Sequence, residues 1–538
     1  MARRISQGLF LALFLLLIFA TAGLTGAGFD AQSAADIPWP VEAFLNLDPF
    51  IALLVALATV TVPATLLFSL IVLVIALFTG RSFCGWVCPM GTLNHAVSET
   101  APGLSAAKKI KANQPARPRH FKYFLLLFSL GAAFFGSALG GLFDPISLVT
   151  RGVALTLLPI FNFLASLLIE TTAGTASHTA QQLSDSAHDL LSGIVVHANG
   201  LLVLGGIWLT LIFAAILFAN RYVPRLWCRW ICPLGALLGL AGRFGILALH
   251  KDESRCTQCK RCEKICSGAA SPMPGKPWLR AECDLCLNCV AVCPENALSF
   301  GRVRPRAHPQ REEAPHPNLK RRHVLTSAAA GMLAVPALRS GSITSSQGRP
   351  HPDCIRPPGA MAEDDFLARC IRCGQCMKIC PTNALHPAFD EAGLEGLWSP
   401  VLIPRIGACE PTCTLCTQVC PTGAIKRLHE DDKTGQNGKQ MVVIGTAFFD
   451  QGRCLPWAMG TPCTVCEEFC PQSPKAIWLE EVERVVNGKT VKLKLPYVDP
   501  SRCSGCGACE NACPVNDRAA IRVSSAGETR NPNNRLLL

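Results

Sequence analysis

The sequence predicts an α-helical membrane domain with four spans, followed by small cysteine-rich domains of the α+β class. Three observations support this prediction. Half of the 538 residues are hydrophobic, and the mean hydropathy is +0.30. The apolar stretches gather in the first part of the chain, before residue 250. The 29 cysteines fall in tight runs, which favours metal ligation over a disulfide framework.

Four apolar stretches are long enough to cross a bilayer, which takes about 20 residues. They cover residues 9–29, 50–80, 121–141 and 200–220. Lys and Arg cluster before the first stretch, between the second and third, and after the fourth. Because positive loops stay in the cytoplasm, we expect a cytoplasmic N-terminus and a return to the cytoplasm near residue 221. A further apolar segment, 153–170, is expected to lie in the outer interface.

The charge of the chain is uneven along its length. Residues 1–348 hold 29 Lys and Arg against 17 Asp and Glu, whereas residues 349–538 hold 21 of each. The basic excess lies beside apolar segments, so membrane topology explains it better than nucleic-acid binding does. We therefore expect a membrane as partner and no nucleic acid.

The membrane part repeats itself. LNLDPF (45–50) leads to FCGWVCPMG, and GLFDPI (141–146) leads to WCRWICPLG. Each repeat contributes Cys-x3-Cys-Pro, and residues four apart share one helical face. If the repeats pack as related halves, four thiols converge on a shared metal or redox centre. Two buried structural pairs or a redox dithiol are the alternatives. The cysteines concerned are Cys84, Cys88, Cys228 and Cys232.

Two runs of C-x2-C-x2-C-x3-C begin after residue 250. In such runs three closely spaced thiolates bind a [4Fe–4S] cluster, and the fourth cysteine completes the cluster of the partner run. A structural zinc site does not call for that fourth cysteine. The spacing therefore predicts a ferredoxin-like domain with two clusters over residues 251–300. Its ligands are Cys256, Cys259, Cys262, Cys266, Cys283, Cys286, Cys289 and Cys293.

Four further quartets lie in residues 350–530, with ligands for four more clusters and about six in the whole chain. The two outer quartets have regular spacing and the two inner ones are stretched, so we expect outer to pair with outer and inner with inner; sequential pairing is the alternative. In chain order they are Cys370, Cys373, Cys376, Cys380; Cys409, Cys413, Cys416, Cys420; Cys454, Cys463, Cys466, Cys470; and Cys503, Cys506, Cys509, Cys513. Cys354 has no companion and is expected to be a plain thiol or a packing residue. No C-x-x-C-H occurs, so we expect no c-type haem.

A twin-arginine stretch, KRRHVLTSAAAGML (320–333), stands between the two cysteine-rich blocks. The preceding residues 301–323 are rich in Pro and charge and predict a linker. The apolar segment 324–340 is short, with small residues, and is typical of an export signal. A domain that acquires its clusters before crossing needs an exporter of folded proteins, so we expect residues 350–530 outside the cytoplasm. A linker with a chance Arg-Arg, leaving everything cytoplasmic, is the alternative.

These motifs carry two family resemblances. Residues 1–300, with FCGWVCPMG, WCRWICPLG and two ferredoxin runs, resemble NapH, the membrane iron–sulfur protein associated with periplasmic nitrate reductase, and also the membrane parts of NosR and CcoG-type proteins. Residues 320–525, with KRRHVL, IRPPGA and SGCGACENACP, resemble the exported four-cluster ferredoxins of the MauM/NapG family. The chain thus looks like a NapH–NapG fusion.

The resemblance implies a multi-pass inner-membrane protein of the quinol dehydrogenase type. Electrons would leave the quinone pool, pass through clusters and reach a periplasmic cytochrome or reductase. No acid–base catalytic constellation is visible, so we expect an electron-transfer component. The alternative function is an assembly or maturation factor that handles the metal or redox state of a partner metalloenzyme.

Overall fold

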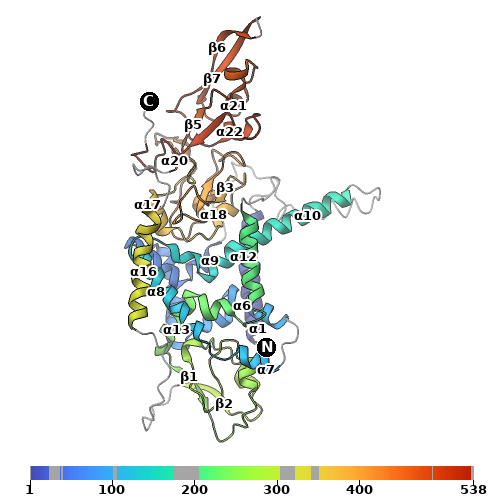
Figure 1. Ribbon diagram of the computed structural model, residues 1–538, viewed down its shortest axis with the longest axis vertical. Coiled ribbons are helices and arrows are strands. Elements are labelled where there is room, and N and C mark those ends of the chain that lie inside the picture. Colours follow the sequence, from blue (N-terminus) through green and yellow to red (C-terminus); the bar gives the residue numbers. More distant parts are fainter. Residues whose placement is uncertain are drawn as a thin grey trace. The chain divides into compact units, whose positions relative to one another are not determined.

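The computed structural model describes residues 2–23, 37, 40–100, 106–173, 205–302, 321–340, 351–486 and 489–534. The chain forms two compact units, and each draws on several segments (Figure 1). Unit 1 comprises Met1–Ile18, Glu42–Gly152 and Ile207–Pro336; unit 2 comprises Phe19–Val41, Val153–Gly206 and Ala337–Leu538. Most of the predicted linker 301–323 lies outside the described residues.

Unit 1 is built from apolar helices followed by a small domain with one strand pair. In chain order its helices are α1 (Ala2–Gly23), α2 (Ala43–Asn46), α3 (Pro49–Thr59), η2 (Ala64–Phe68), α4 (Ser69–Thr79), α5 (Ser82–Trp86), α6 (Pro89–Thr100), α7 (Ala106–Ala112), η3 (Arg117–His120), α8 (Phe121–Phe134), η4 (Leu139–Leu142), α9 (Pro145–Gly152), α12 (Gly206–Ala219), η6 (Trp227–Ile231), α13 (Pro233–Ala241) and η7 (Gly242–Phe244).

The stretch 50–80 is not the single helix that the hydropathy predicted. It forms α3 and then η2 with α4, separated by an extended segment at 61–63. Val60 ends α3 in the left-handed region, with φ 55°. Pro63 lacks a backbone donor and disfavours helical geometry at the residue before it, so the helix cannot continue through this point. The stretch 50–80 is apolar as predicted, but Pro63 divides it into two helical segments.

Two helical stretches of the described residues are long and apolar enough to cross a membrane. They are Ala2–Phe19, with mean hydropathy 1.7, and Pro145–Thr171, with mean hydropathy 2.1. The first overlaps the first predicted span, 9–29, over residues 9–19, and residues 24–29 of that span lie outside the described residues. The second has 27 residues and contains the segment 153–170, which we expected to lie in the outer interface. In it η5 (Val153–Leu157) and α10 (Leu158–Ala173) follow α9 without a break. α8 and α12, in the third and fourth predicted spans, each have 14 residues.

The two repeats begin in the same way. Asp48 accepts hydrogen bonds from the amides of Phe50 (2.8 Å) and Ile51 at the start of α3. Asp144 accepts from the Ser147 amide (2.7 Å) at the start of α9. Each aspartate is followed by proline at the first helical position, a combination that starts a helix. The repeated Asp-Pro therefore fixes the start of a helix in both halves.

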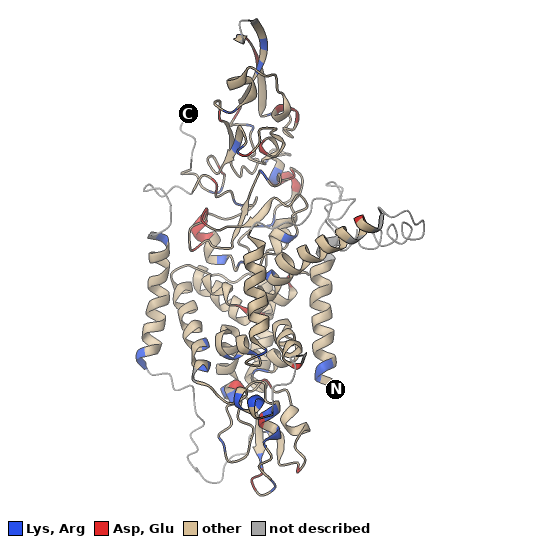
Figure 2. Ribbon diagram, turned by 45° about the vertical axis from the view of Figure 1, so that its right-hand side comes forward, with Lys and Arg blue, Asp and Glu red and all other residues tan. Residues whose placement is uncertain are grey.

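The twin-arginine stretch lies in α16 (Arg321–Ser340), a helix of 20 residues with Arg at both ends (Figure 2). Within unit 1, α16 packs closely on α8. A side chain at Gly331 would clash with the Phe128 carbonyl oxygen, and one at Gly131 would clash with the Ala328 carbonyl oxygen, at 2.5 Å. Small residues at such contacts let two helix backbones approach.

The cysteine-rich blocks form three small domains with one plan. In the first, β1 (Leu247–Lys251) and β2 (Leu298–Arg302) pair antiparallel and enclose both cysteine runs. In the last, β5 (Thr446–Phe449) and β8 (Ile521–Ser524) do the same. In the middle domain an antiparallel bridge joins Ala360 and Ile425. A strand pair in the first and last domains, and a single bridge in the middle one, thus joins the segment before the first run to the segment after the second run.

Short helices carry the third cysteine of each run, and two strand pairs are inserted. The cysteine-bearing helices are α14 (Arg261–Ile265), α15 (Asn288–Ala291), α18 (Gln375–Lys378), α19 (Leu415–Gln418), α21 (Val465–Glu468) and α22 (Ala508–Ala512). The domains also contain η8 (Arg280–Glu282), α17 (Glu363–Arg369), α20 (Glu430–Thr434) and η9 (Leu455–Met459). The inserted pairs are β3 (Leu385–Pro387) with β4 (Pro400–Leu402) and β6 (Ile477–Val486) with β7 (Lys489–Val498).

The arginine of the IRPPGA motif, Arg356, makes buried polar contacts that hold parts of unit 2 together. Arg356 is 1% exposed and forms a two-point ion pair with Glu363, with Nη2 to Oε1 at 2.5 Å and Nε to Oε2 at 3.2 Å. It also donates to the Pro400 carbonyl at 2.8 Å. Arg530 reaches the same Glu363 carboxylate at 2.7 Å. The motif therefore connects the start of the C-terminal cysteine-rich block with β4 and with the C-terminal end of that block.

We expect the Glu363→Gln variant to lower the free energy of unfolding of unit 2 by about 2 kcal/mol at pH 7. Burial favours the neutral acid, but Arg356 and Arg530 lower the pKa of Glu363 to about 2. Because this folded-state pKa lies below the ordinary value, the stabilisation is complete above pH 4.5 and is lost as the pH falls towards 2.

The measurement is thermal unfolding of the wild type and the variant at pH 7 and near pH 3.5, where the gap between them should shrink. Asp365→Asn is the matched control, since its carboxylate is 62% exposed and 3.7 Å from Arg369. Such a pair contributes about 0–0.5 kcal/mol. An equal loss in both variants would contradict the role given to Glu363.

Candidate iron–sulfur sites

Four cavities in the cysteine-rich domains are each lined by four thiols. Every cavity combines three cysteines of one run with the last cysteine of another, and the volumes lie between 320 and 360 Å³. We name them centre A (Cys256, Cys259, Cys262, Cys293), centre D (Cys409, Cys413, Cys416, Cys380), centre E (Cys503, Cys506, Cys509, Cys470) and centre F (Cys454, Cys463, Cys466, Cys513).

The remaining runs show the same exchange of the last cysteine. Cys266 lies within electrostatic range of all three leading cysteines of its partner run, which together form centre B (Cys283, Cys286, Cys289, Cys266). Cys420 stands in the same relation to Cys370 and Cys376 in centre C (Cys370, Cys373, Cys376, Cys420). All 24 cysteines that the spacing singled out are thus gathered into six sets.

The expected pairing of outer with outer and inner with inner runs is wrong. The cavities of centres E and F join the third and fourth runs of the C-terminal block, and the cavity of centre D joins the first and second. The reason is the strand plan, since β5 and β8 close one domain around the third and fourth runs. The wide gap between Cys454 and Cys463 holds η9 and leaves the pairing unchanged.

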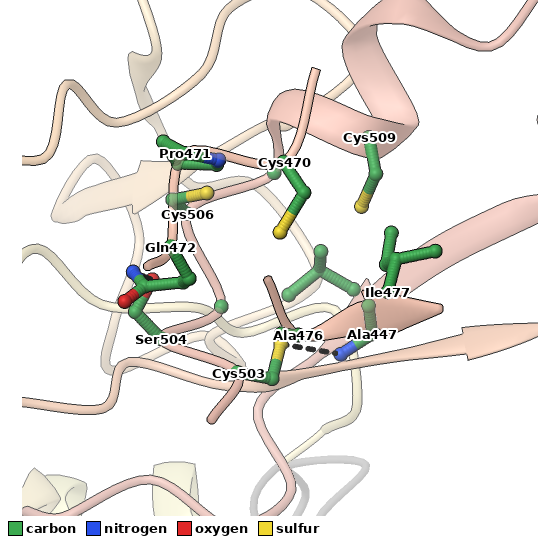
Figure 3. A pocket seen from close by; sticks show the side chains of 13 residues that line it. Ala447, Cys470, Pro471, Gln472, Ala476, Ile477, Cys503, Ser504, Cys506 and Cys509 are labelled. Atoms are coloured by element: carbon green, nitrogen blue, oxygen red, sulfur yellow. Dashed lines mark hydrogen bonds between the residues drawn. The ribbon is translucent and has the colours of Figure 1, made fainter. Parts of the chain in front are cut away.

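The geometry of centre E fits a [4Fe–4S] cluster. Figure 3 shows its four cysteines around one cavity of about 320 Å³. The Cys503 sulfur accepts a hydrogen bond from the Ala447 amide at 3.4 Å. Similar bonds reach Cys266 from the Ala270 amide and Cys380 from the Ala384 amide, both at 3.3 Å. Amide donors to ligand sulfurs are one means by which a protein sets cluster potentials.

The two Cys-x3-Cys-Pro repeats bring their four cysteines together, as predicted. Cys84, Cys88, Cys228 and Cys232 are all buried. Cys232 lies within electrostatic range of the other three, and Cys88 within range of Cys84 and Cys228. We name this set centre G. Across the described residues, no three His, Cys, Asp or Glu side chains are close enough to hold one single metal ion.

Each Cys-x3-Cys pair differs from the predicted shared helical face. Cys84 lies in α5 and Cys228 in η6, whereas Cys88 and Cys232 directly precede α6 and α13. The proline after each second cysteine begins a new helix, because proline is tolerated at the first helical position and not in the interior. Cys88 and Cys232 therefore stand at the N-terminal ends of helices, and burial raises the pKa of both thiols. Cys232 also accepts from the Gly235 amide at 3.1 Å.

Two side-chain amides form a series of hydrogen bonds that ends at Cys228, the first cysteine of the second repeat. Asn94 donates to the Cys228 sulfur at 3.3 Å, and Asn220 donates to the Asn94 side-chain oxygen at 2.7 Å. Both asparagines are buried. Asn94 comes from the first repeat and Asn220 from the second, so this series of hydrogen bonds connects the two halves at centre G.

Two repeat-related arginines connect centre G with centre B. Arg81 and Arg225 each stand three residues before the first cysteine of their repeat, in RSFC and RLWC. Arg81 pairs with Glu282 at 3.2 Å, and Arg225 pairs with Asp284. These two acids flank Cys283, a member of centre B. The sequence analysis missed both arginines, although their equal distance from Cys84 and Cys228 was a readable signal.

Further contacts bring the loop of centre B against centre G. The Trp86 indole donates to the Leu285 carbonyl at 3.0 Å, and a side chain at Gly85 would clash with the Asp284 carbonyl oxygen. Lys122 pairs with Glu282 as well, and all of these charged groups are buried. Three buried cations thus face two carboxylates, which leaves an excess of positive charge beside the thiols.

Centres D and E also meet, within unit 2. The Cys409 amide donates to the Cys506 carbonyl at 2.8 Å, so a backbone hydrogen bond joins a residue of one centre to a residue of the next. Arg405 fastens the same junction by donating to the carbonyls of Cys513 (2.8 Å) and Glu510 (3.1 Å). Because C shares a domain with D, and E with F, the order in unit 2 is C, D, E, F.

Models of 4Fe–4S binding domains match three parts of the chain. One matches residues 61–109 and again 204–251, which contain the two Cys-x3-Cys-Pro repeats; others match 253–269, and 367–386 with 496–517. The methylamine utilization ferredoxin-type protein MauM of Methylorubrum extorquens is 35% identical over 224 residues, which are 39% of this chain and 94% of the relative. No solved structure matches.

The chain belongs to the MauM and NapG family of ferredoxin-type proteins. The ferredoxin-type protein NapG of Escherichia coli is 37% identical over 170 residues, 31% of this chain and 69% of the relative. NapG of Haemophilus influenzae is 32% identical over 222 residues, 41% of this chain and 73% of the relative. The chain is therefore an iron–sulfur electron-transfer protein with [4Fe–4S] clusters, and the four cavities fit that cofactor.

A lysine that the sequence analysis missed distinguishes centre D in this ferredoxin-type protein. Lys433 is 8% exposed, and its ammonium donates to the Cys409 sulfur at 3.3 Å. It also donates to the Glu410 carbonyl at 2.5 Å and the Cys413 carbonyl at 2.7 Å. A buried cation on a ligand sulfur favours the reduced, more negative state of a bound cluster. No motif marks Lys433, because α20 brings it back over the run.

We expect Lys433→Met to lower the reduction potential of centre D by on the order of 60–130 mV. A charge-assisted hydrogen bond contributes about 1.5–3 kcal/mol, and 59 mV corresponds to a tenfold change for one electron. Redox titration followed by electron paramagnetic resonance measures the shift. Lys439→Met, on the exposed side chain that pairs with Asp432 at 2.6 Å, is the control and should leave the titration unchanged. Identical titrations of wild type and Lys433→Met would contradict the role of the ammonium.

The unpaired cysteine lies away from all of these sets. Cys354 packs in a small hydrophobic core with Ala388 and Val401, and it is 2% exposed. Burial raises the pKa of the Cys354 thiol to about 11. A protonated, enclosed thiol is unreactive. This environment is that of a packing residue, which was one of the two expectations.

Proposed function

We propose that this protein takes electrons from membrane quinol and delivers them to a periplasmic cytochrome or reductase. In this proposal residues 1–250 are a NapH-like membrane domain with four spans, 251–300 a cytoplasmic two-cluster domain, and 350–530 a periplasmic four-cluster domain. The 24 cysteines of centres A to F bind six clusters, which supply one-electron transfer when bound. The four cysteines of centre G form a further redox centre in this proposal, and not the site of a single metal ion.

The contact between centre G and the loop of centre B carries the proposal. Arg225 pairs with Asp284 and also lies within electrostatic range of Cys228, Cys84 and Cys286. One guanidinium therefore faces thiols of both centres. Since the membrane repeats adjoin a ferredoxin centre in this way, electrons gathered at the membrane have a short path into centre B and then centre A.

The buried charges around this junction suit an electron carrier. Arg81, Lys122 and Arg225 exceed Glu282 and Asp284 by one charge, and all five are less than 7% exposed. Low solvent exposure strengthens the attraction between these cations and negatively charged thiolates. The side chains hold their geometry through paired carboxylates, so little rearrangement is needed when the charge of a neighbouring centre changes.

The position of α16 supports a crossing between the two ferredoxin blocks. Its 20 residues span about 30 Å, the thickness of a bilayer's hydrocarbon core. The helix packs on α8, which belongs to the third apolar stretch. In the proposal α16 is the internal twin-arginine signal that remains as a membrane segment, with the MauM/NapG-type domain on the outer side.

Two measurements test the proposal. Purified protein in lipid nanodiscs is mixed with a reduced short-chain quinol, and reduction of the iron–sulfur centres is followed by absorbance. Reporters fused at the C-terminus, one active only outside and one only inside the cytoplasm, locate residues 350–530. Centres that stay oxidised with quinol would overturn the electron path. A reporter active only inside would overturn the periplasmic placement.

An assembly or maturation factor for a partner metalloenzyme is the second candidate. The convergence of four buried thiols at centre G favours it, since such a set can also reduce or transfer a metal. The quinol assay separates the candidates. A maturation factor would show no steady quinol turnover, and a strain lacking centre G would accumulate partner enzyme without its metal.

A further inference from the structure

Six cationic side chains line a large cavity in unit 1. Its volume is about 2120 Å³ including its open mouth. Glu99 is an acidic residue of the lining, and it pairs with Arg4 at 2.8 Å. The cations come from α1, α7, α14 and the segment after α12: Arg3, Arg4, Lys109, Arg221, Arg261 and Lys264. The lining thus keeps a strong positive excess that the proposed electron path does not use.

One wall of the cavity is a buried and incompletely paired arginine. Arg3 is 7% exposed, and its Nη2 lies 2.5 Å from His95 Nε2. Burial, together with Arg3 and Arg225, lowers the pKa of His95 to about 4, so the imidazole is neutral at pH 7. The other terminal nitrogen of Arg3, Nη1, has no hydrogen-bond partner among the described residues, and neither has the buried Ser267 hydroxyl on the same lining. Both donors can bind an acceptor in the cavity, and the positive charge of Arg3 favours an anionic one.

Two apolar helices each have one end at this cavity. α1 begins at its wall, and α12 ends at Ala219, directly before the lining residues Asn220 and Arg221. Both helices expose large apolar side chains to the surroundings. On α1 these recur at helical spacing as Ile5, Leu9, Leu13 and Leu16; on α12 they include Ile207, Trp208, Leu211 and Phe218. The cationic cavity therefore adjoins two apolar surfaces.

We propose that this cavity binds the anionic headgroup of a phospholipid from the cytoplasmic leaflet, with its acyl chains along α1 and α12. A basic pocket beside membrane helices is the chemistry that recognises acidic phospholipid headgroups. This inference rests on the membrane position given under the proposed function. A soluble phosphate would use the cations and leave the two apolar surfaces unexplained. An acidic protein would need a protruding surface rather than a hollow one.

Lipid binding to the full-length protein tests this directly. Delipidated protein in a non-ionic detergent is titrated with phosphatidylglycerol, phosphatidylcholine, glycerol phosphate or inorganic phosphate, and bound molecules are counted by native mass spectrometry. Lys109→Gln with Arg221→Gln removes two lining charges outside the cysteine runs. Each cation contributes about 1 kcal/mol, so the double variant should bind phosphatidylglycerol about 30-fold more weakly. Arg3→Gln should weaken it independently.

Lys111→Gln with Arg255→Gln is the matched control, because neither side chain lines the cavity and the charge lost is the same. It should bind as the wild type does. Equal binding of phosphatidylcholine, unchanged binding in both lining variants, or displacement by glycerol phosphate at the same concentration would overturn the inference. Because counting bound lipid molecules needs no quinol, lipid binding without quinol turnover would contradict only the proposed electron path. Quinol turnover without selective lipid binding would sink only the lipid site.

Discussion

Cys84→Ser combined with Cys228→Ser is expected to slow quinol-driven reduction of the iron–sulfur centres by about 100-fold or more. The two thiols are the first cysteines of the two repeats and meet at centre G. Removing both leaves centre G with two of its four thiols, while the pairs of Arg81 and Arg225 with the loop of centre B remain. The six ferredoxin-type sets keep all 24 cysteines, so iron content and the reduced spectrum after dithionite should remain near those of the wild type.

Cys354→Ser is the control for this experiment, since it also removes a buried thiol but lies in the small core of unit 2. Its quinol-driven rate should equal that of the wild type. The double variant distinguishes an entry point from a structural pair. If it reduces its centres at the normal rate, centre G has no part in the electron path and its cysteines are packing residues.

Glu282→Gln is expected to lower the free energy of unfolding of unit 1 by about 3–5 kcal/mol, the usual result when one partner of a buried ion pair is removed. The Glu282 carboxylate forms ion pairs with Arg81, at 3.2 Å, and with Lys122. It also accepts a hydrogen bond from the Tyr123 hydroxyl at 3.4 Å. The amide would leave two buried cations without a counter-charge. Thermal unfolding of the detergent-solubilised protein measures the loss.

Glu253→Gln provides the comparison, because Glu253 lies exposed in the same small domain. It should change stability by less than about 0.5 kcal/mol. The variant of Glu282 should also shift the potential of centre B, since Glu282 precedes Cys283. A stable Glu282→Gln protein with an unchanged potential would show that the arginine and lysine find other partners, and that the junction is held by its backbone contacts.

The cysteine spacing was the most informative part of the sequence. A thiolate quartet needs its members at short, fixed separations along the chain, so Cys256 to Cys293 and Cys370 to Cys513 could be grouped before any fold was known. The repeated Cys-x3-Cys-Pro likewise predicted the convergence at centre G. Both patterns lie within short stretches of the chain, so they can be recognised from the order of the residues alone.

Other features depended on contacts between distant segments. Sequential pairing of the C-terminal runs follows from the strands β5 and β8, which lie 72 positions apart between Phe449 and Ile521. Lys433 reaches Cys409 only because α20 folds back, and the arginines reach Glu282 and Asp284 across some 60 to 200 positions. Proline also divided the apolar stretch 50–80, where hydropathy averages over the break.

By itself, the sequence determined which cofactor this protein is built for, which residues could bind it, and which segments are apolar, because spacing and composition act over a few residues. Only the tertiary structure decided which run completes which centre, which charges stand beside the thiols, and where a cationic cavity adjoins apolar helices. Those properties arise when side chains far apart in the chain share one desolvated space, and burial then sets the strength of every charge within it.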